Sequence, residues 1–592
     1  MTAKCGSAAR ARAADGSFAL TAGNAAAVAR IVRRLDGMPL ALELAAPRLR
    51  VFEPERLADL LDDRFRVLVS TLRTAPARHQ TLRAAVAWSY DLLGAEEQAL
   101  FRALSVFEGG FTLEAAGWMG DAVTLLPALV ERSLVVVDHH RYRLLETLRE
   151  YGRAQLDPDE SHDCHERHLH YCVDLAERAA AGLYTPRSQE WLRLLEAERD
   201  NLRAALRWSL THGKGTDGLR LAAHLADYWD DRSRFGEGVT WLTETLAAAE
   251  DAAPELRALA LAGAAELSIG QGAHGDATSF ARRSLALAEE AGDEPGAVRA
   301  TVLLGHVALY QADYDDAGRL LERALAAYQR LDRPWEAGGV LGRLGHLHRL
   351  QGDFAVARGY LERSLATRTR VGDRWGCAWT VWQLGVLARY EGDYPRAQEL
   401  YGECLARFDE LGDAPSAAHV RYSMGDVARL SGARALATEL YTGSLDQLRE
   451  NGDLRCVASI LGNLGAIALD DTNTAAAARY FTQSLGLRRQ LRDRAGVAEC
   501  LDGFAAINEQ SGDPEAAARL LGTADALRTQ LGAARPESDE LRVAALRSRI
   551  GAETFATAWS AGQGLDSDAV TETLLTNALP LNRNRLLGQR RT

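Results

Sequence analysis

The segment GRLGHLHRLQGDFAVARGYLERSLATRTRV, residues 342–371, decides the fold of this chain. Its apolar residues follow a helical spacing from Leu344, stop at Gly352-Asp353 and resume from Phe354, which predicts a helix, a tight turn and a second helix. Small residues such as Gly345 stand where the two helices must approach closely, because a larger side chain would push their axes apart. The segment is therefore predicted to be one helical hairpin.

The same pattern returns every 40 residues between about residues 255 and 535, which predicts seven repeats. Three of its columns hold alanine (Ala277, Ala317, Ala357, Ala397, Ala437, Ala477, Ala517), leucine (Leu285, Leu325, Leu365, Leu405, Leu445, Leu485) and glycine (Gly305, Gly345, Gly385, Gly425, Gly465). A fixed period of this length is typical of a solenoid, in which each helical pair buries its apolar face only against its neighbours. Most of this protein is therefore predicted to be a binding surface.

Gly-Asp pairs recur between successive units, at Gly292-Asp293, Gly372-Asp373, Gly412-Asp413 and Gly452-Asp453. Glycine can end one helix because it adopts a left-handed backbone, and the aspartate side chain can cap the start of the next helix. These pairs are therefore predicted to be the turns between repeats.

The totals of the sequence exclude several classes of function. A formal net charge of −12 argues against a nucleic-acid or anionic-membrane surface as the main role. The seven cysteines include no CxxC pair, so neither a zinc site nor a disulfide framework is predicted, and a reducing cytoplasm fits. The sequence contains no apolar run long enough for a membrane helix and no apolar signal core at its start.

The spacing of the repeat also carries a family resemblance. A large apolar residue followed by glycine, then alanine and a small residue, as at Leu344, Gly345, Ala357 and Ser364, resembles a tetratricopeptide repeat. Units of that family usually run about 34 residues, and the longer unit here resembles the variant found in large bacterial regulators. The resemblance implies an α-solenoid that binds a protein or peptide.

Residues 1–78 contain the stretch RRLDGMPLAL, residues 33–42, between two predicted helices. Taken alone this is an ordinary helical hairpin. Together with the segments that follow, it resembles the Gly-x-Pro-Leu-Ala segment of STAND-type (NB-ARC-like) signalling ATPases, in which the proline-bearing segment lies against the nucleotide. The resemblance implies that Gly37 and Pro39 are the remnant of a nucleotide-binding site.

Two departures from that family argue against ATP as a cofactor and against an enzymatic role. The sequence has no GxxxxGK[ST] loop to hold phosphates, and the chain is expected to begin inside the nucleotide-binding domain. The Met-His-Asp segment of many relatives is replaced by Leu144-Leu145-Glu146, so its histidine is missing.

Residues 79–157 are predicted to form three helical stretches (80–93, 95–105 and 112–132) and then a short β-hairpin. This region resembles the winged-helix domain that follows the nucleotide-binding core in the same family, where it serves as a regulatory lever. Between residues 80 and 156 it has seven arginines against ten carboxylates, so DNA binding by this domain is not expected.

Residues 158–254 are predicted to be an irregular helical start of the repeat array. Four histidines and two cysteines gather near its beginning, at His162, Cys164, His165, His168, His170 and Cys172. A metal site must be considered, but an exposed helix start without fixed ligand geometry is the favoured interpretation, and no metal site is predicted.

The register of the repeats identifies positions that should face one groove. They are His306, His346, Arg349, Trp379, Trp382, Arg389, His419, Tyr422, Asp426 and Arg429. Stacked arginines beside aromatic rings suit an acidic or aromatic peptide. Alternatively, the arginines are solvated helix ends that favour the helix C-terminus. For the two tryptophans, packing between repeats is the favoured interpretation.

Residues 536–592 are predicted to be a helical cap and a basic tail. Residues 555–564 and a predicted helix over 568–579 resemble the segment that closes the array in large LuxR-type regulators. A helix-turn-helix often follows there, and this chain is expected to lack it, since it stops at Thr592.

The sequence therefore predicts a mainly α protein, a tetratricopeptide solenoid preceded by a winged-helix domain. Its resemblance to LuxR/AfsR-family STAND regulators implies a non-enzymatic, cytoplasmic sensor that binds a protein, a peptide or a small effector. Self-association stays open, and neither membrane binding nor DNA binding by this chain alone is expected. The alternative is an ATP-dependent regulator of the same type, truncated at its N-terminus.

Overall fold

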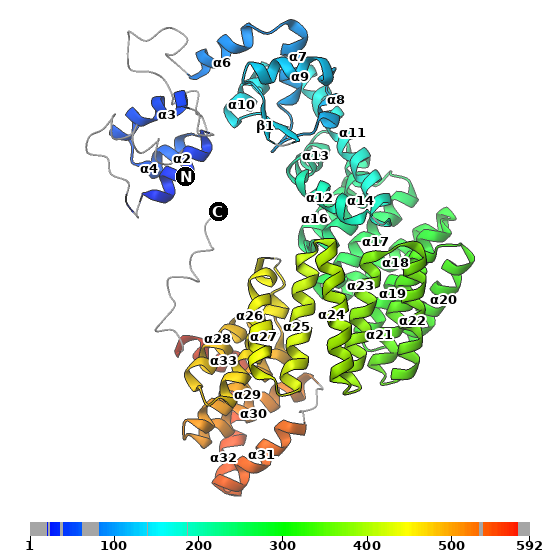
Figure 1. Cartoon of the computed structure of the whole chain (residues 1–592), viewed down its shortest axis with the longest axis vertical. Helices are drawn as coiled ribbons and strands as arrows, with labels where there is room; N and C mark the ends of the chain where they lie inside the picture. The colour runs from blue at the N-terminus through cyan, green and yellow to red at the C-terminus, as the bar shows by residue number, and fades with distance from the viewer. Residues whose placement is uncertain are drawn as a thin grey trace. The chain divides into compact units, whose positions relative to one another are not determined.

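The computed structural model describes residues 21, 24–35, 39–61, 82–138, 140–185, 187–450, 452–531 and 537–577. Nearly all of this part of the chain is helical (Figure 1). The chain divides into two compact units. Unit 1 comprises residues 1–229 and 235–296, and unit 2 comprises residues 230–234 and 297–592. Among the described residues, none of the helices combines the length and apolarity needed to span a bilayer.

The first described residues of unit 1, up to residue 61, form four short helical elements. They are α2 (Ala25–Arg34), α3 (Pro39–Ala45), η1 (Ala46–Arg50) and α4 (Pro54–Leu60). The apolar face of α2 buries Ile31 and Val32 against Leu57 and Leu61, so this segment has a small core of its own. Gly37 lies outside the described residues, and Pro39 is the first residue of α3.

The next part of unit 1 has helices followed by a hairpin and one more helix. Its elements are α6 (Leu82–Asp91), α7 (Ala95–Leu104), α8 (Leu113–Gly117), α9 (Ala122–Glu131), β1 (Val136–Asp138), β2 (Arg141–Arg143) and α10 (Glu146–Gln155). β1 pairs antiparallel with β2, and Phe111 forms an isolated bridge with Tyr142. The predicted stretch 112–132 is two helices, because Asp121 ends the intervening turn and caps α9 through the N–H of Thr124. The winged-helix assignment of this region stays a prediction.

The remainder of unit 1 is helical. Its helices are α11 (Pro158–Leu183), α12 (Ser188–Ala197), α13 (Arg199–Thr211), α14 (Gly215–His224), α15 (Ala226–Asp231), α16 (Phe235–Ala248), α17 (Pro254–Gln271) and α18 (His274–Ala291). α11 is the longest of them at 26 residues and contacts α12, α13 and α14. One continuous apolar core extends from Val86 to Leu267.

Unit 2 contains helices of 17 or 18 residues that alternate with turns. They are α19 (Glu294–Tyr310), α20 (Tyr314–Arg330), α21 (Pro334–Leu350), α22 (Phe354–Val371), α23 (Arg374–Tyr390), α24 (Tyr394–Leu411), α25 (Ala414–Leu430), α26 (Arg434–Glu450), α27 (Leu454–Asp470), α28 (Thr474–Gln490), α29 (Arg494–Gln510) and α30 (Pro514–Leu531). The predicted helix, turn and helix in residues 342–371 are confirmed as α21 and α22.

The Gly-Asp turns have the predicted geometry. Gly372 ends α22 with a φ of 74°, in the left-handed region that favours glycine. Asp373 then caps α23, since its Oδ1 accepts a hydrogen bond from the N–H of Gly376 at 2.7 Å. The same cap occurs at Asp413 and Asp453. The predicted role of these pairs as turns between helices is confirmed.

The small residues of the repeat lie at close contacts between paired helices. A Cβ added to Gly345 would lie 2.7 Å from two side-chain atoms of Leu361, and one added to Gly385 would lie 2.6 Å from the ring of Tyr401. The hydroxyl of Ser364 donates to the carbonyl of Gly338 at 2.7 Å, which ties α22 to α21. Close approach of the helices therefore explains the glycine column, as predicted.

Residues 537–577, the last that the structure describes, form three helices. They are α31 (Glu537–Ile550), α32 (Ala552–Gln563) and α33 (Ser567–Asn577). α32 packs tightly on α30, where Gly522 meets the backbone of Trp559 and Gly562 meets the backbone of Arg519. α33 agrees with the helix predicted over 568–579, and the basic tail lies outside the described residues.

Candidate functional site

A polar cavity of about 420 Å³ lies in unit 2 between the first helices of three consecutive repeats, α25, α27 and α29. Its polar lining residues are Tyr422, Asp426, Arg429, Ser459, Asn463, Arg488, Glu499, Asp502 and Arg542. Three of them, from α25, belong to the predicted groove. They share one face of the helix because they are spaced by four and then three residues. The structure therefore brings this part of the prediction together at a single cavity.

Asp426 is held in place at this cavity by two hydrogen bonds. Its Oδ1 accepts hydrogen bonds from the hydroxyl of Tyr441 at 2.7 Å and from the amide of Asn463 at 3.0 Å. Burial raises the pKa of the Asp426 carboxyl, against the opposing effects of the Tyr441 hydrogen bond and of Arg389 and Arg429. Burial and the charge of Asp426 also raise the pKa of Tyr422 and of Tyr441. Both phenols are therefore neutral hydrogen-bonding groups at neutral pH.

The arginines at the cavity differ in how far they are neutralised. Arg488 pairs with Asp493 and with Glu499, at 3.3 and 2.9 Å. Arg429 borders the cavity close to Asp426, and its buried Nε has no hydrogen-bond partner among the described residues. A buried donor without a partner costs roughly 1–3 kcal/mol.

A run of aromatic rings leads to the cavity from α23. Trp379 and Trp382 stack with ring centroids 4.6 Å apart, and the ring of His419 meets Trp382 edge-on at 6.4 Å. His419 in turn meets Tyr422 edge-on at 6.3 Å. Both tryptophans are half-buried and pack against the core of their repeats. These rings therefore combine packing between repeats with a partly accessible aromatic surface.

Arg349, Arg389 and Arg429 recur at the spacing of the repeat, and the first two contact the same aromatic ring. The guanidinium carbons of Arg349 and Arg389 lie 4.8 and 4.9 Å from the ring centroid of Tyr390, which is 54% exposed. Cation–π contacts of this kind hold guanidinium groups in place while leaving their hydrogen-bond donors available. Arg389 also approaches Asp426, with Nη1 3.9 Å from Oδ2. Each of the three arginines stands one residue before its helix ends, so the helix-end interpretation stays open.

Seven of the ten predicted groove residues do not line the cavity, and His306 and His346 are two of these seven. His306 packs beside Tyr310, with ring centroids 5.1 Å apart. His346 is half-buried, and burial together with the charge of Arg349 lowers its pKa to about 4. His346 is therefore neutral at neutral pH.

Part of the histidine and cysteine cluster of α11 is buried, which corrects the expectation of an exposed helix start. Cys164, His168 and Cys172 are fully buried, because this long helix packs against several others. The ring of His168 meets Phe107 edge-on at 4.9 Å, and burial lowers the pKa of His168 to about 3. This histidine is therefore a neutral core residue.

Several residues at the site were not identified from the sequence. Tyr441 comes from α26, a second helix of a repeat, whereas the register argument considered only first helices. Asn463 does lie on a first helix, in the column of Gln383 and Ser423, and this run of polar residues was an available signal. Tyr390, the last residue of α23, was also missed.

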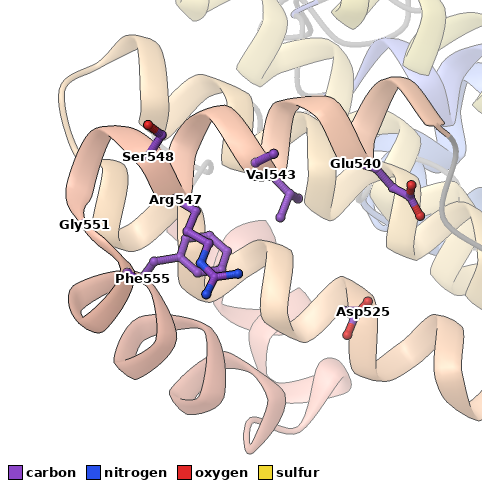
Figure 2. A pocket seen from close by; sticks show the side chains of 9 residues that line it. Asp525, Glu540, Val543, Arg547, Ser548, Gly551 and Phe555 are labelled. Carbon is purple, nitrogen blue, oxygen red and sulfur yellow. The ribbon is translucent and has the colours of Figure 1, made fainter.

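A second cavity, of about 770 Å³, lies among α30, α31 and α32 (Figure 2). Glu540, Val543 and Arg547 reach it from α31, Phe555 from α32 and Asp525 from α30 (Figure 2). None of the predicted groove residues lines it. The cavity at α25, α27 and α29 is therefore the candidate site that sequence and structure share.

Comparison with known proteins identifies the type of repeat. The tetratricopeptide repeat family matches residues 336–410, which span α21 to α24. The chain is 42% identical over 322 residues to "Putative HTH-type transcriptional regulator Rv0890c" of Mycobacterium tuberculosis strain H37Rv, a match covering 50% of this chain and 36% of that protein. The chain thus spans about a third of the length of this curated relative. The protein contains tetratricopeptide repeats and is similar in part to a protein named as a transcriptional regulator.

Two solved structures resemble the chain in part. One is a STAND protein with a tetratricopeptide repeat sensor, PH0952 from Pyrococcus horikoshii, with a TM-score of 0.40 and 14% identity over 76% of this chain and 72% of that one. The other is a Rap protein complexed with competence and sporulation factor, with a TM-score of 0.43 and 15% identity over 69% of this chain and 99% of that one.

Proposed function

We propose that this protein is a non-enzymatic sensor module that binds a peptide, or an extended segment of a protein, at the cavity between α25, α27 and α29. The observation that carries the proposal is the set of groups that meet there. Asn463 offers its amide oxygen, which can accept a hydrogen bond from a peptide N–H, because its amide nitrogen is held by Asp426 and Tyr441. Arg429 offers a guanidinium for a carboxylate, and Tyr422 continues the aromatic run from α23. These groups together suit an extended segment with an acidic and an aromatic side chain.

The shape of the site favours a peptide over a small effector. Beyond the cavity, the ring contacts of Tyr422 continue through His419 to Trp382 and Trp379, so the aromatic and polar groups together are spread over four repeats. A small molecule would fill about 420 Å³ and leave the aromatic run unused. An extended chain can contact both, because its side chains alternate along its length.

The test is binding of a labelled library of short peptides to the full chain, followed by fluorescence polarisation of the selected sequences. Selected peptides should carry a carboxylate and an aromatic residue. Asn463→Ala should weaken their binding by about tenfold, which is about 1.4 kcal/mol and the size of one lost hydrogen bond. Glu439→Ala, on the exposed face of α26, is the matched control and should leave affinity unchanged. Equal affinity of the Asn463 variant and the parent chain would refute the site.

We also propose that the chain belongs to a cytoplasmic signalling regulator of the STAND-type LuxR/AfsR kind, with the region of α6 to α10 acting as a winged-helix relay to a nucleotide-binding partner. The support is the relative named as an HTH-type regulator and the helices-then-hairpin order of that region. Calorimetry of the purified chain with magnesium and ATP should give no binding heat. Micromolar ATP binding would instead favour a nucleotide-dependent regulator.

A further inference from the structure

Three side chains that can ligate a metal meet where α25 faces the start of α27. They are His419, Asp453 and Cys456, and each can offer one ligand atom such that all three atoms lie within 4.8 Å of one another. The Nε2 of His419 lies 3.4 Å from the Sγ of Cys456, and its Nδ1 lies 3.4 Å from the Oδ2 of Asp453. All three residues are half-buried, so solvent can reach the cluster.

The repeat itself positions two of these groups. Asp453 caps α27, and its Oδ1 accepts a hydrogen bond from the N–H of Cys456 at 3.0 Å. This bond fixes the carboxylate and leaves Oδ2 directed at His419. The imidazole is also held by edge contacts with Trp382 and Tyr422. The cluster is therefore preorganised by a helix cap and by aromatic packing.

Comparison with the neighbouring repeats indicates that the turn does not need this cluster. Forty residues earlier, Ser416 stands in place of Cys456 and Trp379 in place of His419. There Asp413 is the helix cap, and its Oδ2 accepts hydrogen bonds from the hydroxyl of Ser416 and from the indole N–H of Trp375. The imidazole of α25 and the thiol of α27 are therefore additions by two consecutive repeats to a turn that forms without them.

We propose that His419, Asp453 and Cys456 bind a zinc ion. Imidazole nitrogen, carboxylate oxygen and thiolate sulfur are the ligand types that zinc takes in proteins. Bonds of about 2.3 Å to sulfur and about 2.0 Å to nitrogen, at a tetrahedral angle, place the two ligand atoms roughly 3.5 Å apart. The observed separation of Nε2 and Sγ is 3.4 Å. Three protein ligands leave a fourth position for water or for a group of a bound segment.

The same three groups could also serve as a thiol nucleophile with its base and an orienting carboxylate. The surroundings favour a cation instead. The carboxylate of Asp453 belongs to the cluster and that of Asp426 lies nearby, so negative charge gathers around the thiol and the imidazole. A bound divalent cation would neutralise these charges, and its affinity would gain from them.

The experiment is a titration of the full, reduced chain with Co²⁺ alone, since cobalt occupies zinc sites and gives a near-ultraviolet absorption when a thiolate binds it. We expect one ion per chain and displacement of the absorption by Zn²⁺. Cys456→Ser should abolish the absorption. Asp453→Asn keeps a helix-capping side chain and should lower affinity by about 10- to 100-fold. Cys377→Ser, which removes a buried thiol elsewhere in unit 2, is the control and should change nothing.

Two results would overturn the proposal. The first is an unchanged cobalt spectrum in the Cys456 variant, with circular dichroism showing that the variant is folded. The second is rapid alkylation of Cys456 by iodoacetamide at neutral pH that Zn²⁺ does not slow and that His419→Gln abolishes. That second result would assign the cluster to thiol chemistry. Peptide binding at Asn463 can succeed or fail independently of either result.

Discussion

Replacing Gly385 by alanine should destabilise its repeat even though alanine is the better helix former. Gly385 lies in α23 opposite Tyr401 of α24, and an added Cβ would lie 2.6 and 2.7 Å from two atoms of the ring. Ordinary van der Waals contact begins at 3.4 Å, so the ring would have to move by most of an ångström. Tyr401 is fully buried and packed on all sides by the core of its repeat, so it has little room to move.

The size of the effect follows from two opposing contributions. Alanine in place of glycine within a helix stabilises by about 1 kcal/mol. Overpacking of a well-filled core costs about 1–3 kcal/mol. Gly402 lies on α24 of the same repeat with nothing within 4 Å of an added Cβ, so Gly402→Ala receives only the favourable contribution. The two variants should therefore differ by about 1–3 kcal/mol in the stability of this repeat, with Gly385→Ala the less stable.

Hydrogen exchange of peptides from α23 and α24 is the appropriate assay, because it reports the opening free energy of one repeat within the full chain. Exchange should accelerate in Gly385→Ala and slow in Gly402→Ala. In a Tyr401→Ala background the ring is absent, and Gly385→Ala should then be stabilising. If Gly385→Ala slows exchange as much as Gly402→Ala does in the parent chain, the close contact is not what selects glycine here.

Three further predictions concern single side chains. The pKa of His168 is about 3 in the folded chain and about 6.5 when unfolded, so the unfolded state binds more protons between these values and stability falls as the pH drops below about 6.5. At pH 5 the free energy of unfolding should be lower by about 2 kcal/mol than at pH 7.5. Urea unfolding at the two pH values measures this difference, and His168→Gln should abolish the contribution of His168 to it. Asp502→Asn leaves the buried Arg528 without its counter-charge. The substitution should lower the stability by about 3–5 kcal/mol, measured as a lower unfolding midpoint. An unchanged midpoint would contradict a buried ion pair. Thr472 has a φ of 57° at the turn position that holds Gly432 one repeat earlier. Thr472→Gly should therefore stabilise the turn by about 1 kcal/mol, and Gly432→Thr should destabilise its turn. Hydrogen exchange of the adjoining helices measures both effects.

Much of the fold could be predicted because several local signals in each repeat agree. Gly372 and Asp373 mark a turn by backbone freedom and by capping, and the apolar spacing of Phe354 and Leu361 marks the helix before it. The structure shows the left-handed glycine and the capping aspartate that these signals require. The fold of such a sequence can be predicted because its independent local preferences agree.

Other features could not be predicted, because they depend on contacts between residues distant in the sequence. Ser364 was interpreted as small to allow close approach, but its hydroxyl also donates to the carbonyl of Gly338, 26 residues earlier. His168 was expected at an exposed helix start, but α11 packs against three other helices and buries it. The pattern of residues along one helix does not show which of its faces are buried until the helices that pack against it are known.

The residues of the candidate site could be predicted only in part from the period of the repeat. The period predicts which column faces the cavity, but it treats all members of a column as equivalent. The members at the site are those that differ: the position of Asp426 is Val386 one repeat earlier and Ala466 one repeat later. Because the frame folds with apolar residues at that position, the carboxylate is not required by the repeat. Its burial against Tyr441 and Asn463 is a local cost that ligand recognition would account for. Departures from the repeat, rather than the repeat itself, therefore indicate where binding should be sought.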